Sequence, residues 1–169
     1  KLMYGLEKNK YDVVMGSRMI NKRDALKGGM PFYKFLGNIT LTKIQNFLLN
    51  TKLAEFHTGY RIYSINSLKN IPFHLNTNDF HFDTEILIQL FIVNSKIKEI
   101  SIPTFYGDEI CHVNGIKYAF DIILTTSIAS LQTNFNLKLS KQYKKNNQLK
   151  KIYKNPIMDK LLVEARKRN

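Results

Sequence analysis

Tyr11-Asp12-Val13-Val14-Met15-Gly16-Ser17-Arg18 is the stretch that decides the fold class. Its apolar centre is typical of a buried β-strand, and Gly16-Ser17 lead out of that strand to Arg18. Ligands of open α/β sheets bind beyond the carboxyl ends of strands, so Arg18 is a candidate to hold a phosphate or carboxylate. A surface arginine that caps a loop is the structural alternative.

Helical and extended patterns alternate along the rest of the chain, which is typical of α/β proteins. Apolar residues at helical spacing predict helices over residues 33–49, 65–70, 82–93 and 114–131, with the end of another helix over 2–8 and weak helical stretches over 149–153 and 158–165. Two further strands are predicted over 60–64 and 97–102. We expect Asn114 to cap the last helix, and a loop that contains Gly28-Gly29-Met30-Pro31 to follow Arg18.

The composition fits one globular unit followed by a basic tail. The chain has 169 residues, of which 44% are hydrophobic, and a net charge of +13. Residues 138–169 hold 11 of the 26 Lys and Arg residues but two of the 13 acidic residues, so the remainder is nearly balanced. We therefore divide the chain into a domain over 1–133 and a basic Lys/Asn-rich helical tail over 134–169.

The cysteine content and the hydropathy pattern suggest the compartment. Cys111 is the single cysteine, so no internal disulfide forms and a reducing, cytoplasmic location is expected. The longest apolar run, over 119–131, falls short of the ~20 residues that a membrane-spanning helix needs. The basic tail suggests a peripheral position at the inner face of the membrane.

The segment Glu55-Phe56-His57-Thr58-Gly59-Tyr60-Arg61 carries a carboxylate, an imidazole and a guanidinium. Strand-like alternation places Glu55 and His57 on one side, where an acid and a histidine could polarise a hydroxyl group. Arg61 could pair with a buried acid or with an anionic substrate. The structural alternative is a salt bridge for Arg61 and a core hydrogen bond for His57.

Two more polar segments open predicted helices. Asp83 and Glu85 lie where a helix dipole favours carboxylates, and their segment lacks a persuasive metal-ligand spacing. Before the last helix, Asp108, Glu109 and His112 form a polar loop, and Lys117 follows at the start of the helix. Backbone amides and Lys117 could hold a diphosphate there, or the acids are simply solvated turn residues.

Four motifs in order give the chain a family resemblance. They are Gly16-Ser17-Arg18, Phe56-His57-Thr58-Gly59-Tyr60-Arg61-Ile62-Tyr63, Phe82-x-x-Glu85 and Glu99-Ile100-x-Ile102-Pro103. Over roughly residues 11–131 the chain resembles family 2 glycosyltransferases, especially the branch of dolichyl- and polyprenyl-phosphate sugar transferases. The resemblance implies a GT-A fold, a Rossmann-like three-layer α/β arrangement with a mixed sheet.

The same resemblance implies an activity. Such enzymes transfer a sugar from a nucleotide-sugar donor, with inversion, to an acceptor hydroxyl or lipid phosphate, and a divalent cation (Mg²⁺ or Mn²⁺) neutralises the leaving diphosphate. In this chain the acids Asp108 and Glu109 disfavour a lipid-phosphate acceptor, because carboxylates repel phosphate. A hydroxyl on a sugar, glycolipid or protein is at least as good an acceptor.

Carried over to this sequence, the resemblance and the motifs together assign the site. The catalytic candidates are Glu55, His57 and Asp83. The substrate-binding candidates are Arg18, Arg61, Glu85, Asp108, Glu109, His112 and Lys117. No residue is assigned as a metal ligand. We expect the residues Arg18, Glu55, His57, Arg61, Asp83, Glu85, Asp108 and His112 to gather around one open cleft.

One family feature is absent from these residues. The chain contains no Asp-x-Asp, and its first residue is Lys1, so we expect an incomplete, acceptor-side portion that lacks the nucleotide-binding half and is inactive by itself. Two alternatives stay open. One is a non-catalytic scaffold that kept the fold, and the other is a basic binder of nucleic acid or an anionic membrane surface. Nucleic acid is disfavoured because no RNA-binding motif is present.

Overall fold

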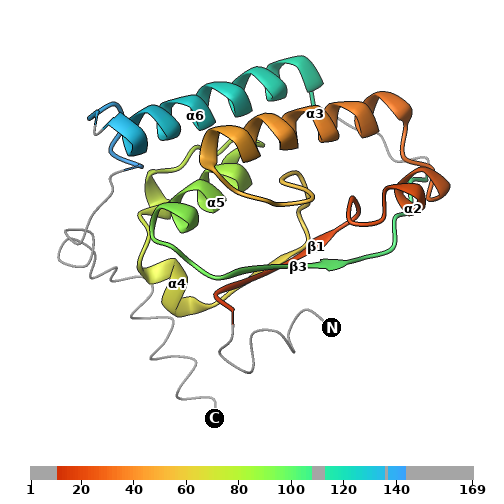
Figure 1. Cartoon of the computed structure of the whole chain (residues 1–169), viewed down its shortest axis with the longest axis horizontal. Coiled ribbons are helices and arrows are strands. Elements are labelled where there is room, and N and C mark those ends of the chain that lie inside the picture. Colours follow the sequence, from red (N-terminus) through yellow and green to blue (C-terminus); the bar gives the residue numbers. More distant parts are fainter. Residues whose placement is uncertain (1–10, 108–112, 136, 144–169) are drawn as a thin grey trace, which may run out of the picture.

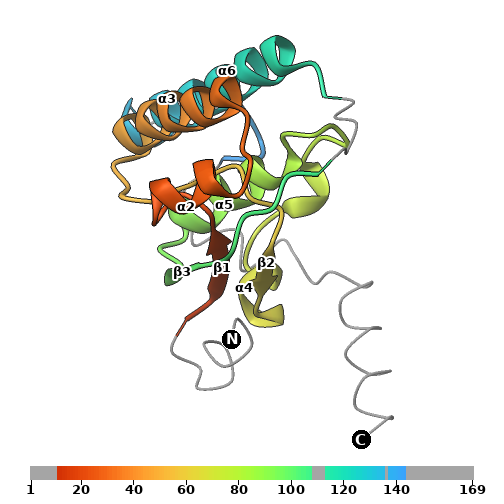
Figure 2. The same ribbon diagram turned by 90° about the vertical axis from the view of Figure 1, so that its right-hand side faces the viewer.

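Three strands form a mixed sheet in the computed structural model, which describes residues 11–107, 113–135 and 137–143. The strands are β1 (Val13–Ser17), β2 (Arg61–Tyr63) and β3 (Ile97–Ser101). Their order is β2-β1-β3, with β1 antiparallel to β2 and parallel to β3 (Figure 2). The predicted α/β class with a mixed sheet is confirmed.

The register of the sheet brings charged residues together beside the central strand. Met15 of β1 lies opposite Arg61 on one side and Glu99 on the other. Ser17 lies opposite Ser101, so the two parallel strands end at the same edge. The chain leaves β1 at that edge through Arg18, in the position where open sheets bind ligands.

Five α-helices pack around this sheet in the described part of the chain. They are α2 (Lys22–Lys27), α3 (Phe32–Leu49), α4 (Ile65–Lys69), α5 (Phe82–Ile92) and α6 (Gly115–Phe135), with a 3₁₀ turn, η1, over Phe73–Leu75. The long helices α3 and α6 lie side by side as an outer layer, and α5 lies between them and the sheet (Figure 1).

The main core lies where α5 covers β1. Val13 and Met15 point to the same face of the strand and pack with Leu87 and Leu90 of α5. Phe56, from the segment that precedes β2, completes this cluster and is fully buried. The core therefore fixes the position of the polar residues on both sides of Phe56.

Local hydrogen bonds explain where several elements begin and end. The Asn114 side chain accepts hydrogen bonds from the backbone N–H of Ile116 and of Lys117, both at 3.1 Å, so it caps α6 as predicted. Ser64 caps α4 in the same way through the N–H of Ser67. Asn50 ends α3 in the left-handed conformation, which asparagine tolerates better than most residues.

The structure differs from the sequence-based predictions in helix α2 and in the start of the tail. Residues 22–27 form helix α2, although we expected a loop there, so that prediction was wrong. The predicted tail begins inside the packed structure, because Tyr143 is buried against Ile88 and Ala129. The helical stretches expected beyond it, and residues 1–10, lie outside the described residues. Within the described part, no helix is both long and apolar enough to span a bilayer.

A matched pair of leucines tests the core. Leu87→Ala removes a fully buried side chain of α5 and should lower the free energy of unfolding by about 3 kcal/mol. Leu124→Ala makes the same change at a half-exposed position of α6 and should cost less than about 1 kcal/mol. Urea unfolding of both variants checks this, and equal losses would contradict the packing described.

Candidate functional site

A buried carboxylate, that of Glu55, lies at the carboxyl end of β1. It is fully excluded from solvent and accepts hydrogen bonds from the Arg18 backbone N–H (2.7 Å) and the Arg18 Nε–H (2.9 Å). The Arg18 Nη2 group bonds to the same carboxylate, and Asn38 of α3 donates from Nδ2 at 2.8 Å. Four donors therefore compensate a charge that burial alone would make costly.

Glu55 is held in place by a second acid on the neighbouring strand. The Glu99 carboxylate accepts hydrogen bonds from the backbone N–H of Ala54 (2.7 Å) and of Glu55 (3.0 Å). Burial raises the pKa of Glu99, although these backbone hydrogen bonds work against the rise. Glu99 belonged to one of the sequence motifs, but its positioning role was missed because it depends on the sheet register.

The Arg18 guanidinium connects Glu55 to the rest of the site. Beyond its bonds to Glu55, it donates to the Tyr106 hydroxyl (2.8 Å) and to the His57 carbonyl (3.1 Å). Tyr106 is fixed by a 2.8 Å bond from its backbone N–H to the Gly28 carbonyl. A side chain at Gly28 would place its Cβ 2.1 Å from the Thr104 carbonyl oxygen, so this close approach requires glycine.

His57 is a neutral imidazole between two arginines. Burial, and then the charges of Arg61 and Arg18, lower its pKa to about 3. Its Nδ1 lies 3.1 Å from the Tyr118 hydroxyl of α6, while Nε2 is buried and has no partner among the described residues. This nitrogen has a free lone pair or N–H group, but it lies in the protein interior and is closed to a ligand in this structure.

Arg61 has a structural role, which was one of the two roles expected from its sequence. Its side chain is buried and donates to the carbonyls of Phe56, Thr58 and Asp83, each at 2.6 Å. These bonds fix the backbone on both sides of His57 and tie it to the first turn of α5. The Asp83 carboxylate lies 3.7 Å from Nη1 of Arg61 and is 46% exposed, so it remains accessible to a substrate.

Glu85 and Lys117 belong to a second network that His81 connects. Glu85 is buried and accepts a hydrogen bond from the Thr77 backbone N–H at 2.7 Å, and burial raises its pKa. The nearest atoms of His81 lie 3.8 Å from the Glu85 carboxylate and 3.9 Å from that of Asp121. This network fastens the 77–81 loop to α5 and α6.

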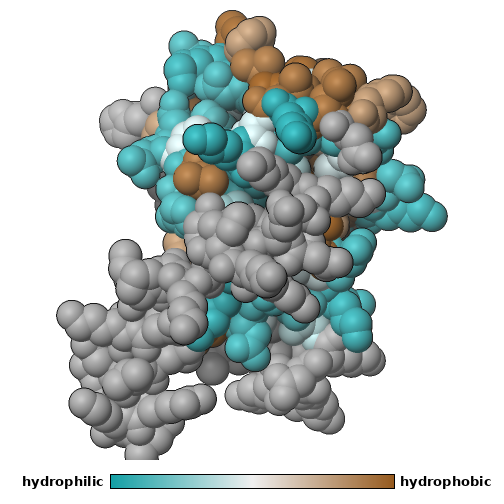
Figure 3. All heavy atoms as spheres, turned by 90° about the vertical axis from the view of Figure 1, so that its left-hand side faces the viewer, coloured by the Kyte–Doolittle hydropathy of each residue, from teal (hydrophilic) through white to brown (hydrophobic). Residues whose placement is uncertain are grey.

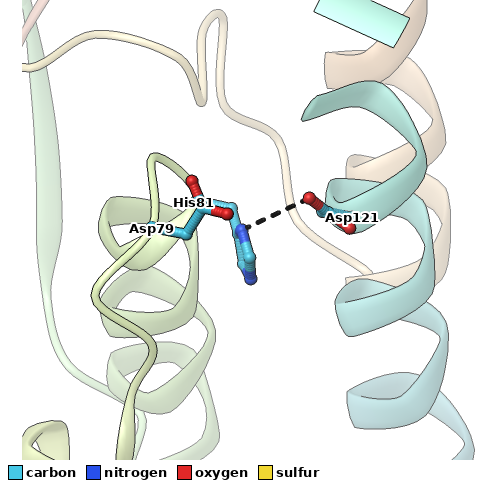
Figure 4. Close-up of side chains that lie close together, drawn as sticks. All are labelled: Asp79, His81 and Asp121. Atoms are coloured by element: carbon cyan, nitrogen blue, oxygen red, sulfur yellow. Dashed lines mark ion pairs between the residues drawn. The ribbon is translucent and has the colours of Figure 1, made fainter. Parts of the chain in front are cut away.

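Asp79, His81 and Asp121 form the one group of metal-ligating side chains found among the described residues (Figure 4). Their ligand atoms lie within 4.8 Å of one another. However, the Lys117 ammonium binds Asp79 at 2.7 Å and Asp121 at 2.9 Å, and these bonds raise its pKa to about 12. Lys117 thus already bridges the two carboxylates that a cation would need and balances one of their two charges.

The predicted site residues divide into three sets. Arg18, Glu55 and His57 meet in one network, which Arg61 and Asp83 extend to α5. Glu85 and Lys117 lie in the second network. The remaining predicted residues, Asp108, Glu109 and His112, lie outside the described residues. Sequence analysis missed Asn38, Tyr106 and Tyr118, which reach the site from distant elements and carry no local motif.

The chain is similar to an uncharacterized archaeal protein over part of its length. No protein-family model matches the chain, and no solved structure matches it. Among curated proteins, the chain is 29% identical over 119 residues to the uncharacterized protein MJ1222 of Methanocaldococcus jannaschii. The matched region covers 68% of this chain and 48% of the relative, so the chain spans about half the length of that protein.

The buried pair between Glu55 and Arg18 leads to a prediction about stability. Glu55→Gln leaves Arg18 without its charged partner and should lower the free energy of unfolding by about 3 kcal/mol. Asp83→Asn changes an exposed carboxylate and should cost less than about 1 kcal/mol. Urea denaturation at neutral pH compares them. If the Glu55→Gln protein were as stable as the wild type, the pair would contribute nothing to the free energy of unfolding.

The low pKa of His57 predicts acid sensitivity. Below pH 6.5, its ordinary pKa, His57 is protonated in the unfolded chain but stays neutral in the folded protein down to about pH 3. The free energy of unfolding therefore falls as the pH falls through this window. At pH 5 the contribution amounts to about 2 kcal/mol. His57→Gln should abolish this part of the loss.

Unfolding free energies of the wild type and His57→Gln at pH 7 and pH 5 measure the difference. The contributions of Glu85 and Glu99 are common to both proteins and cancel in the comparison. Identical pH dependence in the two proteins would mean that His57 titrates normally in the folded state.

Proposed function

We propose that this chain is the acceptor-side portion of an inverting glycosyltransferase, similar to family 2, in which Asp83 is the general base. The observation that carries the proposal is the exposure of Asp83 beside the buried Arg61, at the edge of the Arg18–Glu55–His57 network. Of the three catalytic candidates, Asp83 alone offers a solvent-accessible carboxylate. Glu55 is occupied by four donors and acts as a positioning residue.

In this proposal Asp83 accepts the proton of an acceptor hydroxyl. The hydroxyl oxygen then forms a bond to the anomeric carbon of the donor sugar, while the bond to the leaving diphosphate breaks on the opposite face. His57 acts as a positioning residue, with its Nε2 buried and its Nδ1 3.1 Å from the Tyr118 hydroxyl of α6. Arg18 uses four N–H groups within the protein, and its 22% exposed side chain leaves one for a substrate oxygen.

The divalent cation expected from the resemblance does not fit the described residues. In the group formed by Asp79, His81 and Asp121 the Lys117 ammonium already bridges both carboxylates, and no Asp-x-Asp occurs in the sequence. We therefore derive no step through a cation. In this proposal the cation and the nucleotide sugar are bound mostly by residues outside this chain, and the complete enzyme works in the cytoplasm or at the inner membrane face.

A non-catalytic scaffold is the second candidate, and one observation favours it. The Glu55–Arg18 pair and the Arg61 guanidinium form their hydrogen bonds with other groups of the protein, as expected of a polar core that stabilises a fold. The two candidates differ in what they require of Asp83. A scaffold tolerates its replacement, whereas a transferase loses its base.

Replacing Asp83 in the complete polypeptide that contains this chain tests the proposal. With Asp83→Asn, kcat for sugar transfer should fall at least ~100-fold because the general base is lost, while the KM for donor changes little. Release of nucleoside diphosphate from a panel of UDP- and GDP-sugars, stimulated by polyprenol or glycolipid acceptors, measures the rate.

Asp24→Asn is the matched control, because Asp24 is an exposed carboxylate in the first turn of α2, as Asp83 is in that of α5. It should keep full activity. Full activity of Asp83→Asn would remove the proposed base, and no transfer by the wild type with any donor would favour the scaffold.

A further inference from the structure

Helices α3 and α6 bury many of their polar residues and expose many of their apolar residues. Their buried positions are mainly polar: Asn38, Thr42 and Gln45 in α3, and Thr125, Thr126, Ser130 and Gln132 in α6. The exposed stripe, here called the α3–α6 apolar face, comprises Phe32, Leu36 and Phe47 of α3 and Phe120, Leu124 and Phe135 of α6. Figure 3 shows hydrophobic side chains gathered over this outer layer.

This arrangement is the reverse of a surface helix in water, which buries its apolar side. Polar side chains form hydrogen bonds between the two helices. Gln45 donates to the Thr126 hydroxyl at 3.4 Å, and the Ser130 hydroxyl donates to the Leu48 carbonyl at 2.7 Å. Helices in lipid associate through small and hydrogen-bonding residues in this way and turn apolar side chains outward. The pair is therefore built for apolar surroundings.

The charges of the two helices, and of the sequence that follows α6, indicate which apolar surroundings this face would enter. Helix α3 contains Lys34 and Lys43 and no acidic residue, and α6 contains no charged residue after Asp121. The strongly basic stretch 138–169 follows α6 directly in the sequence. Anionic lipid surfaces bind helices that combine an apolar stripe with basic residues such as Lys34 and Lys43, because hydrophobic insertion and attraction to headgroups act together.

The geometry favours binding in the plane of a membrane. Neither helix can cross a bilayer, and both lie side by side in one layer (Figure 1). With a rise of 1.5 Å per residue, they offer two parallel rods roughly 30 Å long. We propose that the α3–α6 apolar face docks this protein onto an anionic lipid bilayer, with both helices lying in the interface. This proposal does not depend on glycosyl transfer.

Tryptophan fluorescence provides a direct test, because the chain has no tryptophan. Phe47→Trp and Phe120→Trp each place a single reporter on the face, and Phe105→Trp is the matched control. Phe47 is 85% exposed and Phe105 is 86% exposed, but Phe105 follows β3 and lies outside the face. With vesicles of phosphatidylcholine and phosphatidylglycerol, the two face reporters should shift to the blue and be quenched by brominated lipids, and the control should not.

Serine variants measure the contribution of the face to affinity. Phe47→Ser combined with Phe120→Ser should weaken binding of the full chain to these vesicles at least about tenfold, whereas Phe105→Ser should leave it unchanged. Both side chains are exposed, so the variants should fold, and thermal unfolding followed by circular dichroism verifies this.

Three results would overturn the proposal. Equal vesicle binding by all serine variants, lost at high salt, would assign binding to the basic stretch. A blue shift without vesicles that grows with protein concentration would identify a second copy as the occupant. Protection of both reporters in the complete polypeptide without vesicles would show that another part of that protein covers the face.

Discussion

The buried ion pair between Glu55 and Arg18 is the interaction on which the polar end of this structure depends. A carboxylate without solvent is stable only where donors replace its water, and Glu55 has four. Those donors come from the end of β1 and from α3, while Glu99 of β3 holds the backbone of Glu55 itself. One charge thus fixes the relative positions of two strands, a long helix and the loop that enters β2.

The same pair determines the chemistry available next to it. Burial, and then the charges of Arg61 and Arg18, lower the pKa of His57 and keep its imidazole neutral, and its Nε2 has no partner among the described residues. Glu55 and Arg61 use their charges within the protein, so they position other groups. The groups left for a ligand are the free edge of Arg18 and the exposed carboxylate of Asp83. A rigid frame around a few accessible polar groups is the arrangement that preorganised sites require.

Sequence patterns predicted the elements of this fold better than the roles of its residues. Strands β1 and β3 and helices α3, α5 and α6 were located within a few residues, because their apolar periodicity is long and regular. Helix α2 was missed because it is only six residues long and precedes a Gly-Gly-Met-Pro turn. The pairing of Arg18 with Glu55 spans 37 residues, and no local pattern specifies such a contact.

Periodicity also left open which side of α3 and α6 faces the core. It identifies an amphipathic helix, and burial of the apolar side is the default expectation in water. In α3 the polar side has a reason to point inward, because Asn38 must reach the carboxylate of Glu55. Once Asn38 is inside, Leu36 and Phe47 on the opposite side are outside. The buried Glu55 carboxylate needs the Asn38 amide as a donor, and this need helps to turn the apolar side of α3 outward.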